Sequence, residues 1–414
     1  MLLEIIYTQL RVGEIETIFH PSNGAVEFKS PYRTIKVPVL VGPVKNDLAD
    51  LIHIYLIGKA SNGAKDLSST AKAFKTWCLW LNEHDIEPFK PCFEKQRTPT
   101  YGFRYELMTR IQNQEIAAST ASQYINTIKS FYEFLEAKKY VKPGVFFQHE
   151  VCIIDGKRPI QSTDLRLKTP RKHSSSLNPL DLTEQINIQI ASAKAISIEY
   201  QLILKLMLNC GLRIKEAVTI NTMLFNEETL LNSEGALIKG LVISPNTGVA
   251  TKFGIKRELF ITSSLYEQIL DYIDTDTYKK RQKILYSVHS NEFKNIDKGY
   301  APIFITQAGN PFKPETFYGG WTKIKKQYQK EHDHSFPHHP HDCRATFGTN
   351  FLNSALKVTN GDHSVALRQT KDVLGHANVS TTLKYIRYLE RKSINQAVAE
   401  VMDQLVIEAF KDDL

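Results

Sequence analysis

A chain of 414 residues can form at least two hydrophobic cores, because single domains usually contain about 100 to 200 residues. Its formal charge of +8 and pI near 9.0 favour a polyanionic partner, although many basic proteins bind small molecules instead. The sequence excludes a membrane-spanning helix, since no stretch reaches the roughly 18 uncharged apolar residues that one requires.

The start of the chain and the cysteines indicate the compartment. Glu4 interrupts the first apolar run and no basic leader precedes it, so this segment is a poor signal peptide. Five cysteines lie far apart without a CxxC pair, which favours reduced and mostly buried thiols in a cytosolic protein. They are Cys78, Cys92, Cys152, Cys210 and Cys343. We therefore expect a cytoplasmic protein with no membrane partner.

The first 145 residues divide into two predicted parts. Residues 1–45 mix β-branched and turn residues, which predicts an N-terminal extension with a few short strands and no assigned role. Residues 46–145 have helical periodicity and predict a helical domain. Two of its helices have clear apolar faces, formed by Phe74, Trp77, Cys78 and Leu81 in one and by Tyr124, Ile128, Phe131 and Leu135 in the other.

Residues 146–178 lose this periodicity and are rich in Pro, Ser and basic residues, which is typical of a linker. The cations exceed what a merely flexible linker needs, so we prefer a linker that lies along phosphates to one that is only flexible. The candidate DNA contacts, including one lysine of the preceding helix, are Lys129, Lys157, Arg158, Arg166, Lys168, Arg171 and Lys172.

Residues 179–395 predict a second domain, mostly helical with a small antiparallel sheet. A helix breaks at Gly211 and restarts, and the runs ALIKGLVIS and GVATKFGIKRELFIT alternate like paired strands. Helical patterns then return. Residues 396–414 predict a short tail helix, because Val398, Met402, Leu405 and Ala409 recur at helical spacing. The predicted fold class is therefore mainly α with a small antiparallel β-sheet.

The segment CGLRIKEA carries the first candidate site residue. Arg213 follows a glycine at the helix junction, and Glu216 lies one turn further on. In isolation, an exposed arginine paired with a glutamate at i,i+3 explains this pattern without any catalytic role.

The segment HPHDCRATFGTNFL places His341 and Arg344 three residues apart, on one face of a helical turn. Further histidines crowd around it, so zinc binding is an alternative for this segment. These histidines lack the usual paired spacing, and Cys343 would have to leave the apolar side of its helix to act as a ligand, so we expect no metal. The crowded histidines are His332, His334, His338 and His339.

The segment LGHANVSTTLKYIRY places His376 ahead of Tyr385 and Tyr388. Buried tyrosines are common in amphipathic helices, so each residue alone fits a structural role.

Together and in this order, the three segments resemble the active-site boxes of the tyrosine recombinase, or phage integrase, family, with TKFGIKREL as the hairpin between the first and second. The resemblance is dense from about residue 180 to 390, is weaker over 46–140, and does not cover 1–43 or the tail after about 396. It implies that residues 46–145 form a helical core-binding domain and that residues 179–395 form a mixed α/β catalytic domain.

The residue types suit the chemistry that the resemblance implies. In-line attack on a DNA phosphodiester places extra negative charge on the non-bridging oxygens. Arg213 and Arg344 suit those oxygens, because a guanidinium donates bidentately and stays charged, and each positioned cation can supply on the order of 3 kcal/mol. A tyrosine hydroxyl, whose pKa is about 10, needs a base as it attacks, and His341 can serve as that base.

By the resemblance, Tyr385 forms a 3′-phosphotyrosyl link, His376 supports the phosphate and a hairpin lysine protonates the leaving 5′ oxygen. Lys252 is our first choice for that acid. The turn is one residue longer than the family's most familiar hairpin sequence, so Lys256 remains an alternative acid. Glu216 is assigned a supporting role. Tyr388 is assigned to packing, with a slip of one helical turn left open.

Two residues depart mildly from the family pattern, Cys343 in place of leucine and Ala345 in place of a basic residue or histidine. Neither removes a required group. No cofactor is expected, because a covalent link stores the phosphodiester energy without ATP or metal, and the sequence has no GxxxxGK[ST] loop.

The predicted function is a site-specific DNA recombinase, or integrase, that integrates or excises a mobile element. The resemblance implies double-stranded DNA with specific recombination sites as partner, a tetramer on paired sites, a Holliday-junction intermediate and a place in the bacterial cytosol or nucleoid. Accessory DNA-bending or directionality factors, the target sequence and the integration or excision bias are left open. The tail helix packs on its own domain or docks on a neighbouring protomer.

Two other functions compete with this prediction. Type IB topoisomerases and telomere resolvases use the same active-site set, but the helical domain before the linker and the compact boxes favour a recombinase. A non-catalytic DNA-binding architectural or regulatory protein of the same fold is the second alternative, and the complete residue set argues against it.

Overall fold

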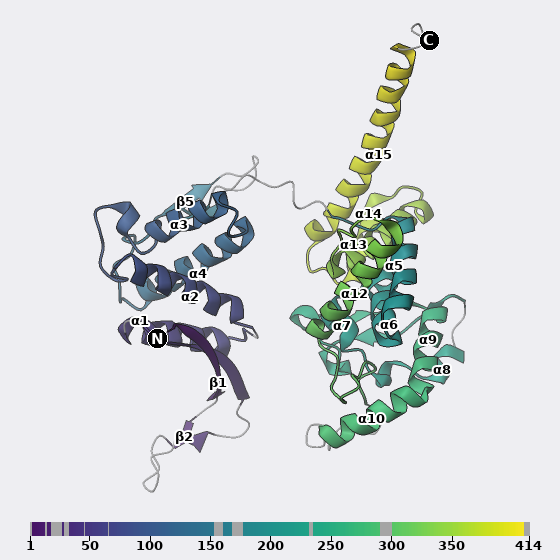
Figure 1. Cartoon of the computed structure of the whole chain (residues 1–414), viewed down its shortest axis with the longest axis horizontal. Helices are drawn as coiled ribbons and strands as arrows, with labels where there is room; N and C mark the ends of the chain where they lie inside the picture. Colours follow the sequence, from purple (N-terminus) through teal and green to yellow (C-terminus); the bar gives the residue numbers. More distant parts are fainter. Residues whose placement is uncertain are drawn as a thin grey trace. The chain divides into compact units, whose positions relative to one another are not determined.

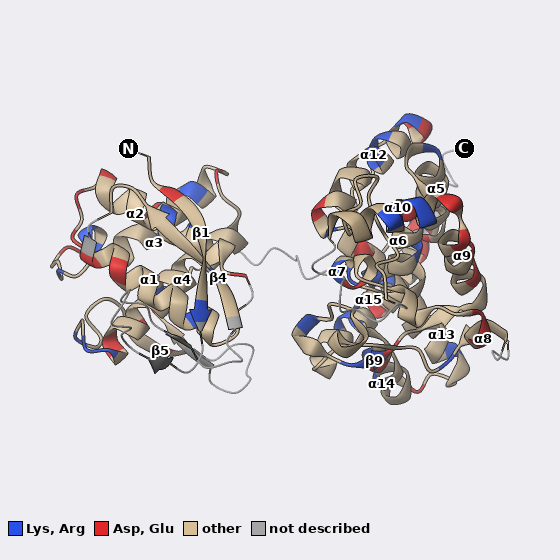
Figure 2. Cartoon of the chain, turned by 90° about the horizontal axis from the view of Figure 1, so that it is seen from below, with Lys and Arg blue, Asp and Glu red and all other residues tan. Residues whose placement is uncertain are grey.

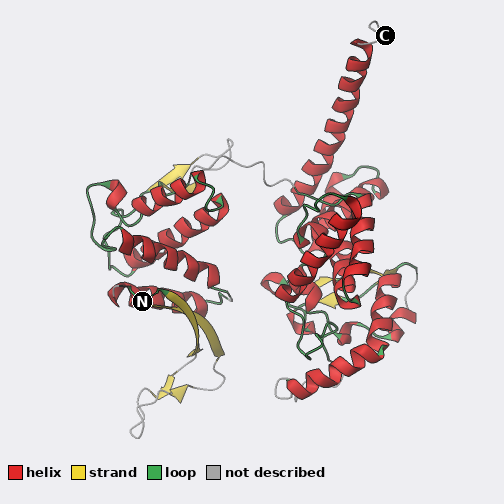
Figure 3. Ribbon diagram, viewed as in Figure 1, coloured by secondary structure: helices red, strands yellow, loops and turns green. Residues whose placement is uncertain are grey.

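The computed structural model describes residues 2–12, 15–17, 27–28, 33–44, 46–64, 66–152, 160–167, 177–231, 235–289 and 300–409. These form two compact units, Met1–Arg171 and Lys172–Leu414 (Figure 1). Helices dominate, and the strands pair in two-stranded antiparallel sheets, which confirms the predicted fold class (Figure 3). None of the described helices has the length and apolar character to cross a bilayer.

The first unit is built on four helices with an aromatic core. The rings of Phe74 and Trp77 meet the ring of Phe131 edge to face, with centroids 5.2 and 6.0 Å apart. Both predicted apolar faces are buried, apart from the half-buried Tyr124. The helices are α1 (Asn46–Ser61), α2 (Ser68–Glu83), α3 (Tyr101–Gln112) and α4 (Ala118–Ala137), with a short 3₁₀ turn η1 (Lys95–Arg97).

The N-terminal strands belong to this helical unit. Strand β1 (Glu4–Val12) pairs antiparallel with β4 (Arg33–Val41), and β2 (Ile15–Thr17) pairs with β3 (Glu27–Phe28). Leu3, Val37 and Leu40 are buried in the same core as the helices. The strands predicted for residues 1–45 therefore exist, but their apolar face makes them part of the helical unit instead of a separate extension.

The predicted linker is partly wrong. Strands β5 (His149–Cys152) and β6 (Ile160–Thr163) form a hairpin, and Leu165 and Leu167 then enter the core of the first unit. The Tyr101 hydroxyl donates a hydrogen bond to the Asp164 carboxylate in the same segment. The described parts of this segment, residues 146–152 and 160–167, therefore belong to the first unit, because a few apolar side chains outweigh a polar average composition.

Only two of the candidate DNA contacts, Lys129 and Arg166, lie among the described residues. Arg166 is exposed, and Lys129 forms an ion pair with Glu133 on the same helix at 3.2 Å. The remaining candidates, Lys157, Arg158, Lys168, Arg171 and Lys172, lie outside the described residues.

The second unit packs helices around small paired strands. Strand β8 (Val242–Ile243) pairs with β9 (Arg257–Glu258), and β7 (Leu237–Ile238) pairs with β10 (Ile261–Thr262), as the alternating runs predicted. The helices are α5 (Leu182–Ala195), α6 (Ile198–Cys210), α7 (Ile214–Val218), α8 (Glu227–Leu231), α9 (Ser263–Asp274), α10 (Asp276–Val288), α12 (Pro314–His332), α13 (Pro340–Val358), α14 (His363–Leu374) and α15 (Val379–Ala409), and the 3₁₀ turns are η2 (Thr222–Leu224), η3 (Pro245–Thr247) and η4 (Lys252–Gly254).

The tail differs from its prediction. Helix α15 runs without interruption from Val379 to Ala409 and extends away from the rest of the second unit (Figure 1). The predicted boundary at residue 395 therefore falls inside one helix, which contains neither Gly nor Pro to break it.

The cysteines behave as predicted. All four whose side chains the structure describes are free thiols, and Cys78, Cys210 and Cys343 are buried while Cys92 is exposed. Burial raises the pKa of the Cys78 thiol to about 12, so this group stays protonated and inert.

Candidate active site

The end of helix α6 creates the first part of the site. Gly211 follows the helix with φ +63°, and a Cβ at this position would lie 2.3 Å from the ring of Phe347. Only glycine fits this left-handed, crowded position. The reversal that it permits brings Arg213 to the start of helix α7 and leaves the Gly211 carbonyl free to accept a hydrogen bond from Arg344.

Glu216 on α7 is the anion at the centre of the site, with no exposed surface. Its carboxylate accepts hydrogen bonds from Arg213 Nη1 at 2.8 Å and from Arg257 Nη2 at 2.8 Å, and Arg344 Nη1 lies 3.9 Å away. Burial alone would raise the pKa of this carboxyl, but the hydrogen bonds and charges of Arg257 and Arg213 lower it to about 2. One carboxylate thus faces three guanidinium groups.

Arg344 on helix α13 joins two helix ends. It is 2% exposed, and its two terminal nitrogens donate to the carbonyls of Gly211, after α6, and of Leu374, the last residue of α14. Carbonyls at a helix C-terminus carry partial negative charge, so this place suits a cation. Burial and the neighbouring charges of Arg213 and Arg257 lower the pKa of Arg344 to about 9, which leaves it charged at neutral pH.

Arg257 is a site residue that the sequence reasoning missed. It lies on β9, where it is buried, and its Nε donates to the Val373 carbonyl at 3.1 Å. Strand β9 lies against α14, and the labels of both can be followed in Figure 2. A signal existed in the hairpin, because Arg257 stands at the inward position between exposed Lys256 and Glu258.

The two predicted histidines lie within the electrostatic field of the arginines. Partial burial and the charge of Arg344 lower the pKa of His341, and Arg213 contributes to the same shift. Burial, followed by the same arginines, lowers the pKa of His376 to about 3. Both rings are therefore neutral at pH 7, so His341 can accept a proton there.

Tyr385 lies on α15 beside His376. It is 5% exposed, and the two rings are 6.2 Å apart at an interplanar angle of 24°. A Cβ on Gly348 of α13 would lie 2.6 Å from the Tyr385 ring, so this glycine makes the room that the ring occupies. Burial raises the pKa of the Tyr385 hydroxyl, whereas Arg344 and Arg213 act to lower it, which places the phenol in their field.

The segment between His376 and Tyr385, which includes the start of α15, does more than connect them. The fully buried Thr382 hydroxyl lies 3.0 Å from His376 Nδ1, which fixes the imidazole plane. The sequence reasoning treated this threonine only as part of the connection.

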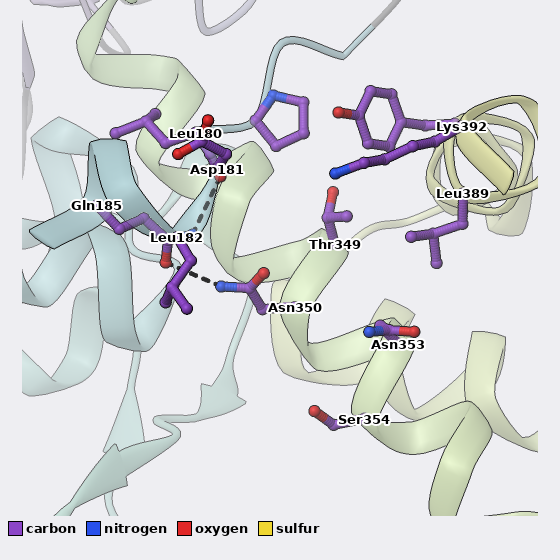
Figure 4. A pocket seen from close by; sticks show the side chains of 12 residues that line it. Leu180, Asp181, Leu182, Gln185, Thr349, Asn350, Asn353, Ser354, Leu389 and Lys392 are labelled. Atoms are coloured by element: carbon purple, nitrogen blue, oxygen red, sulfur yellow. Dashed lines mark hydrogen bonds between the residues drawn. The ribbon is translucent and has the colours of Figure 1, made fainter. Parts of the chain in front are cut away.

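Tyr388, one turn further along α15, has different neighbours from Tyr385. It lines a cavity of about 380 Å³ between the start of α5, helix α13 and α15, together with Leu180, Asn353 and Lys392 (Figure 4). Burial raises the pKa of Tyr388, and the other causes are the carboxylates Glu184 and Asp181. The causes of its shift thus include none of the arginines, which distinguishes it from Tyr385.

The two hairpin lysines both lie near the site but differ in setting. Lys252 is at the start of η4, exposed, with Nζ 5.0 Å from the centroid of the Phe253 ring, and its charge helps to lower the pKa of His341. Lys256 is exposed next to Arg257 and is not among the causes of that shift. This difference favours Lys252.

The histidine-rich loop serves packing in the described structure. His338 is 3% exposed, and its ring contacts Glu184 Oε1 at 3.0 Å and the Asn178 carbonyl at 3.1 Å. Across the described ranges, no group of three or more His, Cys, Asp and Glu is arranged to hold a metal ion.

Comparisons with known proteins agree with this geometry. The model of the phage integrase family matches residues 181–392, which cover more than half of the chain and every residue of the arginine cluster. The chain is 22% identical to tyrosine recombinase XerC of Bacillus pumilus, over 82% of this chain and 92% of the relative. It is 25% identical to tyrosine recombinase XerC of Halalkalibacterium halodurans, over 73% of this chain and 84% of the relative.

A solved structure of similar fold is that of the Tn1549 transposon integrase in complex with transposon right end DNA. Its TM-score is 0.52 at 14% identity, over 84% of this chain and 99% of that one. The order of the boxes, the clustered arginines beside a tyrosine and the match of the family model lead to one conclusion: the chain belongs to the phage integrase family, the tyrosine recombinases.

Proposed function

We propose that this protein is a site-specific DNA recombinase that cleaves and rejoins DNA through a covalent 3′-phosphotyrosyl link at Tyr385. The surplus of positive charge around Glu216 carries this proposal. Arg213, Arg257 and Arg344 outnumber the carboxylate that they share, so the cluster has a net positive charge and suits a bound anion. A phosphodiester supplies that anion, and its non-bridging oxygens gain charge in the transition state.

We assign each step of the reaction to one of these residues. Tyr385 attacks phosphorus in line, and neutral His341 takes the phenolic proton. Arg213 and Arg344 hold the non-bridging oxygens, and His376, fixed by Thr382, donates to the phosphate. Lys252 gives its proton to the departing 5′ oxygen. The bond between phosphorus and the 5′ oxygen breaks as the bond between phosphorus and the tyrosine oxygen forms.

The covalent link keeps the energy of the broken phosphodiester. A 5′ hydroxyl of another strand can attack the phosphotyrosine and release Tyr385, so strand exchange needs no nucleotide cofactor. The similar proteins differ in kind. The relatives in sequence are named XerC recombinases, whereas a solved structure of similar fold is a transposon integrase. We favour integration or excision of a mobile element, with double-stranded DNA sites as partner.

Trapping of the covalent adduct tests this function. Nicked duplexes, selected from random sequences by their binding to the Tyr385→Phe protein, should become attached to wild-type protein and not to Tyr385→Phe. Tyr388→Phe is the matched control, because it removes the other hydroxyl of the same helix and should retain the adduct. If DNA that the wild-type protein binds specifically gives no adduct, the non-catalytic DNA-binding function is supported instead.

We further propose that the end of helix α15 docks on a neighbouring protomer in a tetramer on paired sites. Ile394, Val398, Val401 and Met402 lie along one stripe of the helix and are between 50% and 61% exposed. Their exposure argues against packing on the same domain. Truncation after Arg391 should abolish assembly on DNA, measured by light scattering, while unchanged assembly would contradict docking.

A further inference from the structure

The loop that carries Lys252 also presents an unusual aromatic residue. Phe253 has φ 60° and ψ 17°, a left-handed conformation that bulky residues rarely adopt, and Gly254 follows with φ +69°. The Phe253 side chain is 84% exposed, and its ring lies beside the Lys252 ammonium at 5.0 Å. The left-handed backbone of Phe253 and the exposure of its ring are both unfavourable for the isolated protein.

Burial within this unit does not offset the unfavourable backbone. At this exposure the ring has little protein surface against it, so the fold gains almost nothing from a phenyl group here. Asparagine or glycine would adopt the same backbone more easily. Strained residues without a packing reason occur mainly at functional sites, where a partner makes use of them.

The position of the loop identifies the partner. After η4 the chain leads directly into β9, where Arg257 contacts Glu216 of the phosphate-binding cluster. Lys252 and Lys256 are exposed on either side of Phe253. An apolar ring between two cations suits a polymer with negative backbone groups and flat apolar faces, which is the chemistry of nucleic acid.

We propose that Phe253 inserts its ring against the base step beside the phosphate that Tyr385 attacks, and so holds Lys252 at the leaving oxygen. The proposal rests on the function proposed above and assigns this chain a residue for positioning DNA. Partial unstacking of one step by an apolar side chain would fix the distance from the loop to the phosphate. Because every base has a flat face, this contact sets position more than sequence.

Two variants separate the ring from the backbone. Phe253→Asn keeps a residue that tolerates the left-handed conformation and removes the ring, whereas Phe253→Trp keeps a flat aromatic group. Each is made in full-length protein, once with Tyr385 intact and once with Tyr385→Phe. Thermal unfolding should be unchanged or slightly higher for Phe253→Asn, because the ring is exposed.

The first measurement is 2-aminopurine fluorescence, with the probe placed in turn at each position of the selected duplex. Bound Tyr385→Phe protein should raise the signal at one step, Phe253→Asn should lose that rise, and Phe253→Trp should keep it. This measurement needs no cleavage, so it tests Phe253 even if the proposed chemistry fails. An equal rise with Phe253→Asn would overturn the proposal.

The second measurement is the single-turnover rate of adduct formation. Phe253→Asn should slow it about 10- to 100-fold and Phe253→Trp should restore it to within a few-fold of wild type. A slower rate without any difference in fluorescence would overturn insertion, because the ring would then act only on Lys252. Absence of the adduct with wild-type protein would reject the recombinase chemistry and leave the fluorescence result to decide the DNA contact.

Discussion

Two buried glutamates in the second unit hold arginines in different ways. Glu199 on α6 is 1% exposed, and it accepts hydrogen bonds from Arg281 and from the Tyr272 hydroxyl, the latter at 2.9 Å. Arg281 also donates to the Ile305 carbonyl at 3.0 Å. Among the described contacts, one guanidinium thus faces one carboxylate, and the charge is balanced within the protein.

Glu216 is equally buried, but three guanidinium groups surround it and the Arg213 side chain is 22% exposed. A buried ion pair by itself therefore says little about function, since Glu199 and Arg281 form one for the fold. A surplus of one sign that reaches the surface favours binding of an ion of the opposite sign. This contrast supports our proposal that the Glu216 cluster binds an anion, whereas the Glu199 cluster serves the fold.

The largest effect on stability is expected at the balanced cluster. Arg281→Met should lower the free energy of unfolding by about 3 to 5 kcal/mol, because it leaves the Glu199 charge buried without its ionic partner. Urea unfolding measures this loss. The rate of adduct formation per folded molecule should stay within about twofold of wild type. A clear decrease in this rate would show that the two clusters are coupled.

At the Glu216 cluster we expect the opposite result, a large loss of activity with little loss of stability. Arg213→Lys keeps the charge but loses the planar fork, so adduct formation should fall about 10²- to 10³-fold, a loss of roughly 3 to 4 kcal/mol in transition-state stabilisation. The unfolding free energy should change by about 1 kcal/mol or less, because Arg257 still neutralises Glu216. Single-turnover kinetics and urea unfolding of the same preparation test both parts.

The sequence predicted the residues of the active-site boxes better than it predicted the residues that surround them. Arg213, His341, Arg344, His376 and Tyr385 were proposed from residue types and order, and the folded chain places them within one electrostatic field. Arg257 was missed, because its role depends on the register of β9, which turns it inward onto a glutamate 41 positions earlier. Strand alternation can mark Arg257 as inward-facing, but the partner that it meets is set by tertiary packing.

Composition misled the reasoning where a few apolar residues decide the packing. The predicted linker averages as polar, yet Leu165 and Leu167 attach it to the first unit. Pairing of β1 with β4 across an intervening hairpin also could not be read locally. The length of α15, by contrast, was readable, because the stretch 379–409 lacks any helix breaker.

Acid should distinguish the Glu216 cluster by its pH dependence. The folded pKa of this carboxyl is about 2, below its ordinary value of 4.5, so its ionised form stabilises the folded state by about 3 kcal/mol above pH 4.5. This contribution is lost as the pH falls from 4.5 through 2. The difference in unfolding free energy between wild type and Glu216→Gln should therefore shrink as the pH falls from about 5 to about 2. Exposed Glu228→Gln is the matched control and should give a small difference that does not change.

The smallest expected effect tests anion binding at the Glu216 cluster directly. Inorganic phosphate should occupy the surplus charge at Arg213, and at about five times its dissociation constant it should stabilise the folded protein by about 1 kcal/mol. Thermal unfolding in phosphate, compared with chloride at equal ionic strength, measures this shift. Arg213→Gln should reduce it strongly, whereas Arg281→Met should retain it, because the Glu199 cluster has no charge to offer. An equal shift in both variants would mean that phosphate acts by general salt exclusion, and the contrast between the two glutamates would then lose its functional meaning.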